Sequence, residues 1–433
     1  MNFTNTYTKQ QWIAEQARRH PERVFTTLHR QVDMEWMRES WRKTRKDGAV
    51  GIDGVTAREY AANLEANLQD LMSRMKSGRY QAPPVRRHYL SKADGGKRPL
   101  GIPTLEDKVA QRAVLMLLEP IYEQDFRPCS HGFRPGRSAH DGLDSLRGGI
   151  VKQKLHWVID ADISGYFDSI DPGHLRGFLD LRIKDGVVRR LLDKWLKAGV
   201  LEAEVLSRPK TGTPQGGVIS PLLSNIYLHH VLDKWFEEEV VPRVSGRCQL
   251  VRYADDFVMC FSTQHSGERV MRVLGKRLGR YGLKLHERKT HYVDFRAGQG
   301  KGVGAVTSFD FLGFTHVWGR SRRGKWVLRR FTAKDRLARA ISSVNAWCRK
   351  YRHLPMTKQQ AHLARVIRGH CNYYGVTGNF DRLQAFRYWI TRIWKKWLSR
   401  RSWRGGSNWE WMNRILLRYP LPRARVVHSV YST

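Results

Sequence analysis

Three aspartates placed on two apolar segments are the residues of this sequence best suited to chemistry. Asp255 and Asp256 lie within LVRYADDFVMCF, residues 250–261. The apolar run on each side of the pair is short and rich in β-branched and aromatic residues, so we predict two strands joined as a β-hairpin with two carboxylates at its tip. Adjacent carboxylates raise each other's pKa unless a cation binds them, and hard divalent cations prefer carboxylate oxygens. A solvated Asp-Asp turn is the simpler structural explanation, and the pair alone does not exclude it.

A second acidic segment favours a metal site over a solvated turn. In HWVIDADISGYF, residues 156–167, a period of two predicts a strand with Val158, Asp160 and Asp162 on one face. An aspartate on so apolar a strand costs free energy unless it is paired or binds a metal. Spacing does not choose between Asp160 and Asp162. Three aspartates from two strands could hold two Mg²⁺ ions, a pair that activates a hydroxyl nucleophile and stabilises a leaving pyrophosphate in phosphoryl transfer.

The motifs around these acids resemble those of one family. The string Tyr253-Ala254-Asp255-Asp256 is similar to the YxDD motif of reverse transcriptases, and the alanine in second place resembles the group II intron reverse transcriptase/maturase family. Further segments resemble that family in the expected order: GAVGIDGVT (48–56), VRRHYLSKADGGKRPLGIP (85–103), SHGFRPGRSAHDGL (130–143), PQGGVISPLLSN (214–225), LKLHERKTHYVDF (283–295) and FDFLGFTHVW (309–318). The resemblance covers most of the chain, and the ordered set is more specific than any single motif.

The resemblance implies roles for individual residues. It selects Asp162 and the backbone carbonyl of Ile163, together with Asp255 and Asp256, as ligands of two Mg²⁺ ions, for which Mn²⁺ can substitute. It places Phe167 at the steric gate, where a flat ring collides with a ribose 2′-hydroxyl; a plain core phenylalanine is the structural alternative. The implied nucleotide-binding residues are Lys92, Arg98, Phe167, Gln215 and Lys289. The implied contacts to template or nucleotide in the 130–143 segment are Arg134 and Arg137.

The charge of the chain gives an independent indication. Its 433 residues include 77 Lys and Arg against 40 Asp and Glu, a formal net charge of +37. So large an excess indicates a polyanionic partner. A membrane surface is the rival explanation, but no long apolar span supports it. The N-terminus has no apolar core of signal-peptide type, so we expect no membrane partner. The five cysteines form no CxxC pair, so neither a zinc ribbon nor a disulfide framework is indicated, and a reducing cytoplasm fits. With the family resemblance, we expect a bacterial cytoplasmic ribonucleoprotein.

The composition shifts after residue 330. Residues 331–433 hold 21 Lys and Arg, 3 acids and 7 of the 15 Trp. Cations and aromatic residues are interleaved there at helical spacing, and since aromatic faces stack on bases we expect nucleic-acid contacts. The expected contacts are Arg365, Arg368, Arg392, Lys395 and Lys396. The region resembles the thumb and maturase domain of the family. Because the chain ends at Thr433 without the Cys and His motifs of the family's endonuclease domain, we expect no second-strand cleavage.

The resemblance implies an α+β fold, a right-hand polymerase whose fingers and palm combine antiparallel sheet with helices and whose thumb is α-helical. Within the fingers we expect a helix from about residue 104, ended or kinked by Pro120. The predicted divisions are 1–85 (N-terminal helical extension and start of the fingers), 86–330 (reverse transcriptase fingers and palm), 331–400 (thumb/maturase (X) domain) and 401–433 (basic C-terminal DNA-binding tail).

By resemblance, the expected function is that of an RNA-directed DNA polymerase, a nucleotidyltransferase. It would bind its group II intron RNA, assist splicing as a maturase, and reverse-transcribe the intron during retrohoming. The implied partners are group II intron RNA, an RNA template/DNA primer duplex, target DNA and dNTPs. Three alternatives stay open: a bacterial reverse transcriptase of defence or diversification type, a protein that is mainly an RNA-binding splicing cofactor, and an RNA-dependent RNA polymerase with the same palm.

Overall fold

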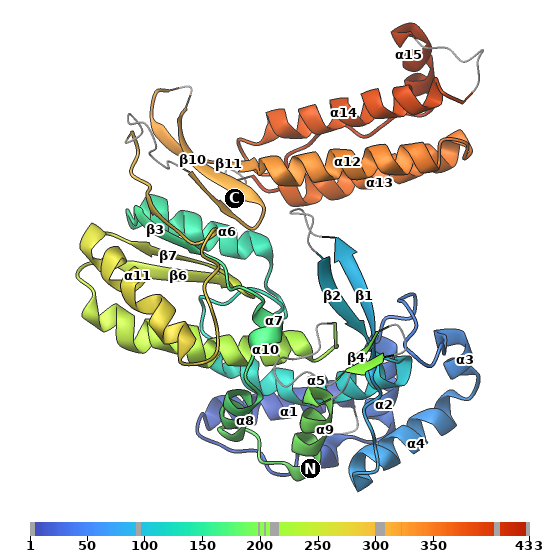
Figure 1. Cartoon of the computed structure of the whole chain (residues 1–433), viewed down its shortest axis with the longest axis vertical. Helices are drawn as coiled ribbons and strands as arrows, with labels where there is room; N and C mark the ends of the chain where they lie inside the picture. The colour runs from blue at the N-terminus through green and yellow to red at the C-terminus, as the bar shows by residue number, and fades with distance from the viewer. Residues whose placement is uncertain are drawn as a thin grey trace. The chain divides into compact units, whose positions relative to one another are not determined.

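A computed structural model describes residues 5–91, 97–197, 200–202, 205–207, 216–298, 308–321, 323–401 and 408–429. The chain divides into two compact units, Met1–Tyr292 and Val293–Thr433 (Figure 1). Mainly antiparallel sheets combine with helices, and the C-terminal region is helical, so the predicted α+β class is confirmed. The predicted boundary between residues 330 and 331 lies inside the second unit, and the four-part division stays a prediction. Among the described residues, no helix is long and apolar enough to cross a membrane.

The first unit is built on a long buried helix. Helix α5 runs from Leu105 to Asp125, and almost its whole middle section is buried. Helices α1 (Thr6–Arg19) and α2 (Met34–Lys43) pack against it. The prediction that Pro120 ends or kinks this helix was wrong about the end, because α5 continues for five more residues. Proline cannot donate to the carbonyl four residues earlier. That carbonyl, of Met116, accepts instead from the side-chain amide of Gln10 on α1, at 3.0 Å.

A buried polar group ties α5 to its neighbours. The Asp107 carboxylate accepts hydrogen bonds from the Tyr80 hydroxyl, from Trp195 Nε1 at 2.7 Å and from Gln111 Nε2 at 3.0 Å. Burial raises the pKa of Asp107 to about 6. Gln111 in turn accepts from the backbone N–H of Ile219 at 3.3 Å. Helix α5 therefore supports the chain where it enters α10 (Ser220–Leu228).

The sheet that carries the predicted acids has the strand order β6-β7-β3-β8. Its strands are β3 (Trp157–Ala161), β6 (Cys248–Tyr253), β7 (Asp256–Phe261) and β8 (His291–Asp294). Strands β6 and β7 form the hairpin predicted for residues 250–261, and β3 lies antiparallel on the other side of β7. Helix α11 (Gln264–Gly279) packs against β3 and β7, and α6 (Ala139–Arg147) lies beside β6. Residues Val251, Val258 and Met259 of the hairpin are fully buried.

The remaining elements of the first unit surround this core. A mixed sheet of order β2-β1-β4-β5 contains the predicted basic hairpin, which is antiparallel. Its strands are β1 (Val85–Ser91), β2 (Lys97–Ile102), β4 (Val200–Glu202) and β5 (Val205–Ser207). The other helices are α3 (Ala57–Ala62), α4 (Leu64–Ser77), α7 (Tyr166–Ser169), α8 (Pro172–Asp180) and α9 (Gly186–Leu196). After α10 the helix continues through two π-helical segments, η3 (His229–Asp233) and η4 (Phe236–Val240).

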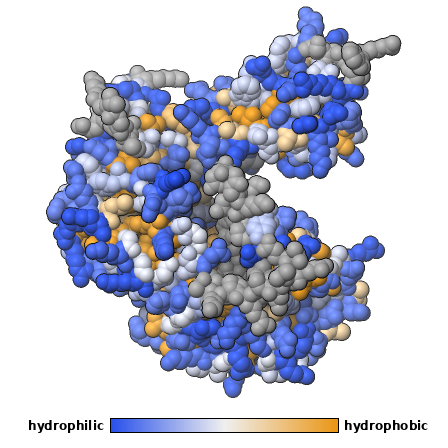
Figure 2. Space-filling view, viewed as in Figure 1, coloured by the Kyte–Doolittle hydropathy of each residue, from blue (hydrophilic) through white to orange (hydrophobic). Residues whose placement is uncertain are grey.

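The second unit has its own core. Its sheet contains β9 (Ser308–Phe311), β10 (Phe314–Arg320) and β11 (Trp326–Thr332), and its helices are α12 (Lys334–Lys350), α13 (Met356–Tyr374), α14 (Phe380–Leu398) and α15 (Trp409–Arg418). Leu363, Phe386 and Trp394 are buried between the helices. On the face seen in Figure 2, hydrophilic residues surround the apolar side chains that show along these helices.

Candidate active site

The β6–β7 hairpin places two carboxylates at the end of the sheet. Tyr253 pairs with Asp256, so Ala254 and Asp255 form a two-residue turn between them. Ala254 has a φ of 58°, the left-handed region that glycine usually occupies in such turns. A residue with a Cβ there costs about 1 kcal/mol, so other contacts must hold the turn in this shape. Asp255 and Asp256 are both half-buried.

Strand β3 delivers the third carboxylate. Ala161 pairs with Phe257, so the next residue, Asp162, comes level with Asp256 at the end of the sheet. Asp160 pairs with Val258 and lies two residues farther back. The register therefore distinguishes Asp162 from Asp160, which spacing alone did not.

A neighbouring segment fixes the end of β3. The backbone N–H of His286 donates to the Asp162 carbonyl, and that of Ser164 donates to the Lys284 carbonyl, both at 2.8 Å. Ile163 lies between them, bridged to Leu285. Backbone hydrogen bonds to residues 284–286 thus fix the segment that carries the Ile163 carbonyl, the predicted metal ligand.

Lys289 lies at the predicted metal site. Its Nζ donates to Asp162 Oδ2 at 2.7 Å, and its side chain is 59% exposed. The sequence predicted Lys289 as a nucleotide contact, and the structure brings its ammonium group directly to the Asp162 carboxylate. The contact reduces the repulsion among three neighbouring acids, because it places a positive charge beside one of them.

These carboxylates suit a divalent cation in chemistry and in position. Asp162, Asp255 and Asp256 supply only hard oxygen donors, which Mg²⁺ and Mn²⁺ prefer. Within the part of the chain that the structure describes, no three His, Cys, Asp or Glu side chains are already arranged as a metal-binding cluster. Lys289 is the side chain that would share Asp162 with an ion. The donor set and its place at the strand ends fit the predicted metal.

Two aromatic residues follow Asp162, and the structure separates their roles. Tyr166 is buried, and its hydroxyl donates to the Ser224 carbonyl at 2.7 Å. Phe167 is only half-buried and packs at an angle against Tyr166, with ring centroids 5.4 Å apart. Phe167 therefore has ring surface to offer a ligand, as a steric gate requires, and Tyr166 is a core residue.

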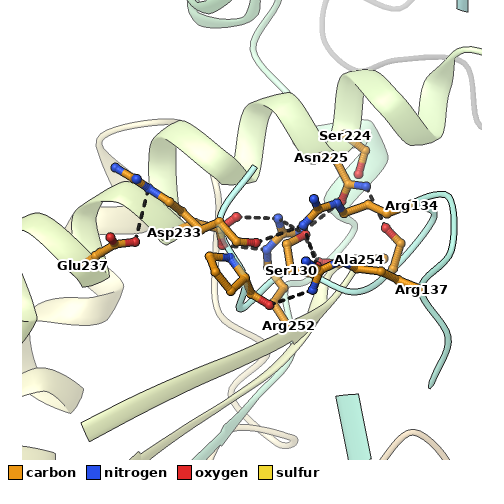
Figure 3. Close-up of polar contacts among 12 residues, drawn as sticks. Ser130, Arg134, Arg137, Ser224, Asn225, Asp233, Glu237, Arg252 and Ala254 are labelled. Atoms are coloured by element: carbon orange, nitrogen blue, oxygen red, sulfur yellow. Dashed lines mark hydrogen bonds and ion pairs between the residues drawn. The ribbon is translucent and has the colours of Figure 1, made fainter. Parts of the chain in front are cut away.

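An arginine that the sequence reasoning missed lies under the β6–β7 turn. Arg252 is fully buried, and each of its five N–H groups has an acceptor. Two go to Asp233 at 2.6 and 2.7 Å, and single bonds reach Asn225 Oδ1 and the Ala254 carbonyl at 3.0 Å and Ser130 Oγ at 2.8 Å. Figure 3 shows these contacts. The available signal was an arginine inside an apolar strand, where an unpaired charge is not tolerated.

The two arginines predicted in the 130–143 segment differ in their surroundings. Arg134 is buried and forms a 2.9 Å ion pair with Glu123. It also donates to the carbonyls of Arg127 and Ser130, both at 2.9 Å, and Figure 3 shows Arg134 near Ser130. The Arg134 guanidinium is thus engaged within the protein and supports this loop, and its predicted contact with template or nucleotide stays a prediction. Arg137 is half-buried and donates to the Pro128 carbonyl at 3.1 Å.

Phe133 is a second residue that the sequence reasoning missed. It is 55% exposed, has a φ of 57°, and its ring centroid is 6.3 Å from that of Tyr253. Phe133 thus presents an exposed aromatic ring, on a backbone in the left-handed region, beside the β6–β7 turn.

Three predicted nucleotide-binding side chains lie beyond the described part of the chain and stay predictions. Lys92 and Gln215 are outside the described residues. Arg98 lies on β2, where its backbone pairs with Leu90, but its side chain is not among those described.

The predicted nucleic-acid residues of the second unit lie on helix surfaces. Arg365, Arg368, Arg392 and Lys396 are exposed, and Lys395 is half-buried. The Arg392 guanidinium lies over the rings of Tyr388 and Trp389, 5.7 and 5.3 Å from their centroids. The Lys395 ammonium lies 5.1 Å from the ring centroid of Trp409. All three aromatic side chains are more than 40% exposed, so cations and stacking faces are presented together.

Comparison with known proteins gives consistent matches. The sequence model of the family described as reverse transcriptase (RNA-dependent DNA polymerase) matches residues 90–316. Protein YkfC of Escherichia coli is 35% identical over 326 residues, which cover 67% of this chain and 82% of YkfC. Group II intron-encoded protein LtrA of Lactococcus lactis is 40% identical over 230 residues, 52% of this chain and 37% of LtrA. Nuclear intron maturase 1 of Arabidopsis thaliana is 34% identical over 95 residues, 22% of this chain and 13% of that protein.

Proposed function

Because the chain belongs to the reverse transcriptase family and is thus an RNA-directed DNA polymerase, we propose that Asp162, Asp255 and Asp256 are its catalytic residues and bind two Mg²⁺ ions. The observation that carries the proposal is the register of β3 and β7, which brings Asp162 level with the hairpin turn. Ile163 is the proposed backbone ligand.

The chain's own residues have distinct tasks in this proposal. Bound Mg²⁺ would activate the primer 3′-hydroxyl and neutralise the leaving pyrophosphate. Asp162, Asp255 and Asp256 hold the ions, and Lys289 offsets their negative charge when the ions are not bound. Phe167 tests the sugar of the incoming nucleotide. Lys92, Arg98, Gln215 and Lys289 are the proposed contacts to that nucleotide.

Primer extension on an RNA template tests this proposal. Protein stripped of divalent ions should extend a DNA primer only after Mg²⁺ is added, and Mn²⁺ should replace it. Binding of the template–primer duplex, measured by fluorescence anisotropy, should need no divalent ion. Extension in the presence of excess chelator would contradict the metal assignment, and binding without extension in Mg²⁺ would contradict the polymerase assignment.

We propose further that this protein binds a group II intron RNA, assists its splicing and copies it at a DNA target in a bacterial cell. The support is the similarity to LtrA, whose name describes a group II intron-encoded protein, and the cation–aromatic surface of the second unit. Arg137, Arg365, Arg368, Arg392, Lys395 and Lys396 are the proposed nucleic-acid contacts. A double variant, Asp255→Ala with Asp256→Ala, should still promote splicing but make no DNA. Loss of splicing in a variant that binds RNA normally would contradict two separable functions.

The predicted gate gives a test of sugar selection. Phe167→Ala should raise incorporation of rNTPs relative to dNTPs by about 10- to 100-fold, because the ring that collides with the 2′-hydroxyl is removed. Tyr166→Phe is the matched control, since Tyr166 is buried and directed at Ser224. Single-nucleotide incorporation with dATP and ATP measures both ratios. An unchanged ratio in Phe167→Ala, or an equal change in Tyr166→Phe, would show that the gate is elsewhere.

A further inference from the structure

We propose that Arg252 is a positioning residue for the catalytic turn, and that its buried guanidinium sets the geometry in which Asp255 and Asp256 bind metal. This inference rests on the proposed metal-binding role of the two aspartates. The five N–H groups of Arg252 are directed at other acceptors than these two carboxylates. Its link to the site is the 3.0 Å hydrogen bond that it donates to the Ala254 carbonyl, one residue before Asp255.

Stability alone does not explain a charged pair at this place. The side chains of Arg252 and Asp233 have no exposed surface at all. Removing two charges from water costs nearly as much free energy as their attraction returns, and apolar side chains of the same volume often stabilise a core as well. An apolar side chain could fill the space beneath the turn. It could not donate a hydrogen bond to the Ala254 carbonyl.

The guanidinium is itself anchored to a rigid element. Asp233 lies in the π-helical segment η3 and accepts two hydrogen bonds, and Asn225 on α10 accepts a third. The planar fork of an arginine cannot rotate while these bonds are intact. Its hydrogen bond to the Ala254 carbonyl therefore fixes the turn relative to the helix formed by α10 and η3. Figure 3 shows the helix on one side of Arg252 and the turn residue Ala254 on the other.

The turn is held from a second direction by the 129–132 segment. The backbone N–H of Arg252 donates to the Cys129 carbonyl, and that of His131 donates to the Arg252 carbonyl, both at 2.8 Å. Gly132 lies so close that a Cβ at this position would be 2.4 Å from the Ala254 nitrogen. Asn225 also donates to the Gly132 carbonyl at 2.7 Å, so the same helix fixes this segment.

This arrangement predicts a specific defect when it is loosened. Mg²⁺ requires near-ideal octahedral geometry, so small displacements of its carboxylate ligands weaken binding. The third carboxylate, Asp162, directly follows β3, and none of the five hydrogen bonds of Arg252 reaches it. Freeing the turn should therefore change the distance between ligands on two different strands. The affinity for Mg²⁺ and kcat should both fall, and the affinity for the template–primer duplex should stay the same.

Arg252→Lys is the first variant. Lysine keeps the charge that pairs with Asp233, but its ammonium cannot serve five acceptors spread around a planar fork. Arg182→Lys is the matched control, because Arg182 is also buried, pairs with Asp125 at 3.0 Å and donates to backbone carbonyls, but its partners belong to other segments than the turn. Both changes should lower the melting temperature.

The Mg²⁺ requirement for extension should distinguish Arg252→Lys from Arg182→Lys. Arg252→Lys should raise the Mg²⁺ concentration for half-maximal extension by about 10- to 100-fold and lower kcat, with the KM for template–primer within about twofold of wild type. Arg182→Lys should leave the Mg²⁺ requirement unchanged. Mn²⁺ binding to the protein–duplex complex, followed by electron paramagnetic resonance, should weaken in Arg252→Lys alone. Equal metal requirements in the two variants would overturn the proposal.

Gly132→Ala provides a second route if Arg252→Lys fails to fold. The added Cβ pushes on the Ala254 nitrogen and leaves the buried ion pair intact. Gly148→Ala is its control, since nothing lies within 4 Å of a Cβ there. Gly132→Ala should show the same rise in metal requirement, and a normal requirement would overturn the proposal. If the wild-type protein bound Mn²⁺ but made no DNA, the proposed polymerase function would be contradicted. The role of Arg252 would still be tested in that case, because Mn²⁺ binding by the variants can be compared without any DNA synthesis.

Discussion

Asp255→Ala should reduce RNA-templated primer extension by roughly 1,000-fold or more, because a lost carboxylate ligand removes several kcal/mol of transition-state stabilisation and each 1.4 kcal/mol is a factor of ten. The affinity for the template–primer duplex should stay within about twofold, since the cations that bind phosphates are unchanged. Single-turnover extension and duplex binding by anisotropy measure the two quantities separately.

Asp160→Asn is the control for this experiment. Asp160 lies on β3, two residues before Asp162, and is paired with Val258. Its replacement should leave extension near the wild-type rate. If Asp160→Asn abolished synthesis as completely as Asp255→Ala, the metal site would lie deeper along β3 than the register indicates.

RNA affinity should fall by roughly 1,000-fold or more between about 50 and about 200 mM salt, because each bound phosphate releases counterions. The net charge of +37 and the exposed cations of α13 and α14 are the physical basis. Filter binding over a salt series measures the slope of log affinity against log salt. A flat dependence would contradict nucleic-acid binding through this surface.

A charge-matched pair of variants locates the nucleic-acid surface. Changing Arg368, Arg392 and Lys396 to Gln should reduce the salt slope by about 0.7 for each phosphate of single-stranded RNA that the protein no longer neutralises. Changing Arg38, Arg42 and Arg45 to Gln removes the same charge, but these arginines already pair with Glu65, Glu39 and Asp47. The control should leave the slope nearly unchanged. Equal effects would mean that total charge, and not this surface, governs binding.

The local sequence pattern was sufficient to predict the strands that carry the proposed catalytic aspartates. The period of two in residues 156–167 and the paired apolar runs of 250–261 predicted the strands that the structure contains. Side-chain alternation is set by the backbone of a single strand, so it can be recognised without knowing what the strand packs against. The α+β class was predicted from the family resemblance that the ordered motifs carry, and the structure confirms it.

Three features of the protein depend on its tertiary structure and not on local sequence. Spacing did not separate Asp162 from Asp160, and only the family resemblance selected Asp162. The positions of the two carboxylates at the end of the sheet depend on the register between β3 and β7, which are separated by almost a hundred residues. The continuation of α5 past Pro120 depends on Gln10, which lies on a different helix. The sequence shows Arg134 only as a cation in a glycine-containing loop. Its partners, the Glu123 carboxylate and two backbone carbonyls, are brought to it by the fold.

Arg252 shows the difference most clearly. The sequence determines that an arginine stands three residues before Asp255, inside a strand too apolar for an unpaired charge. Its acceptors come from a helix and a loop elsewhere in the chain, Asp233, Asn225 and Ser130, and only the fold brings them together. Strands and turns follow from interactions between near neighbours, so the sequence alone determined which groups could do the chemistry. The distances between those groups depend on residues remote in the chain, so the tertiary structure decided how the groups are held.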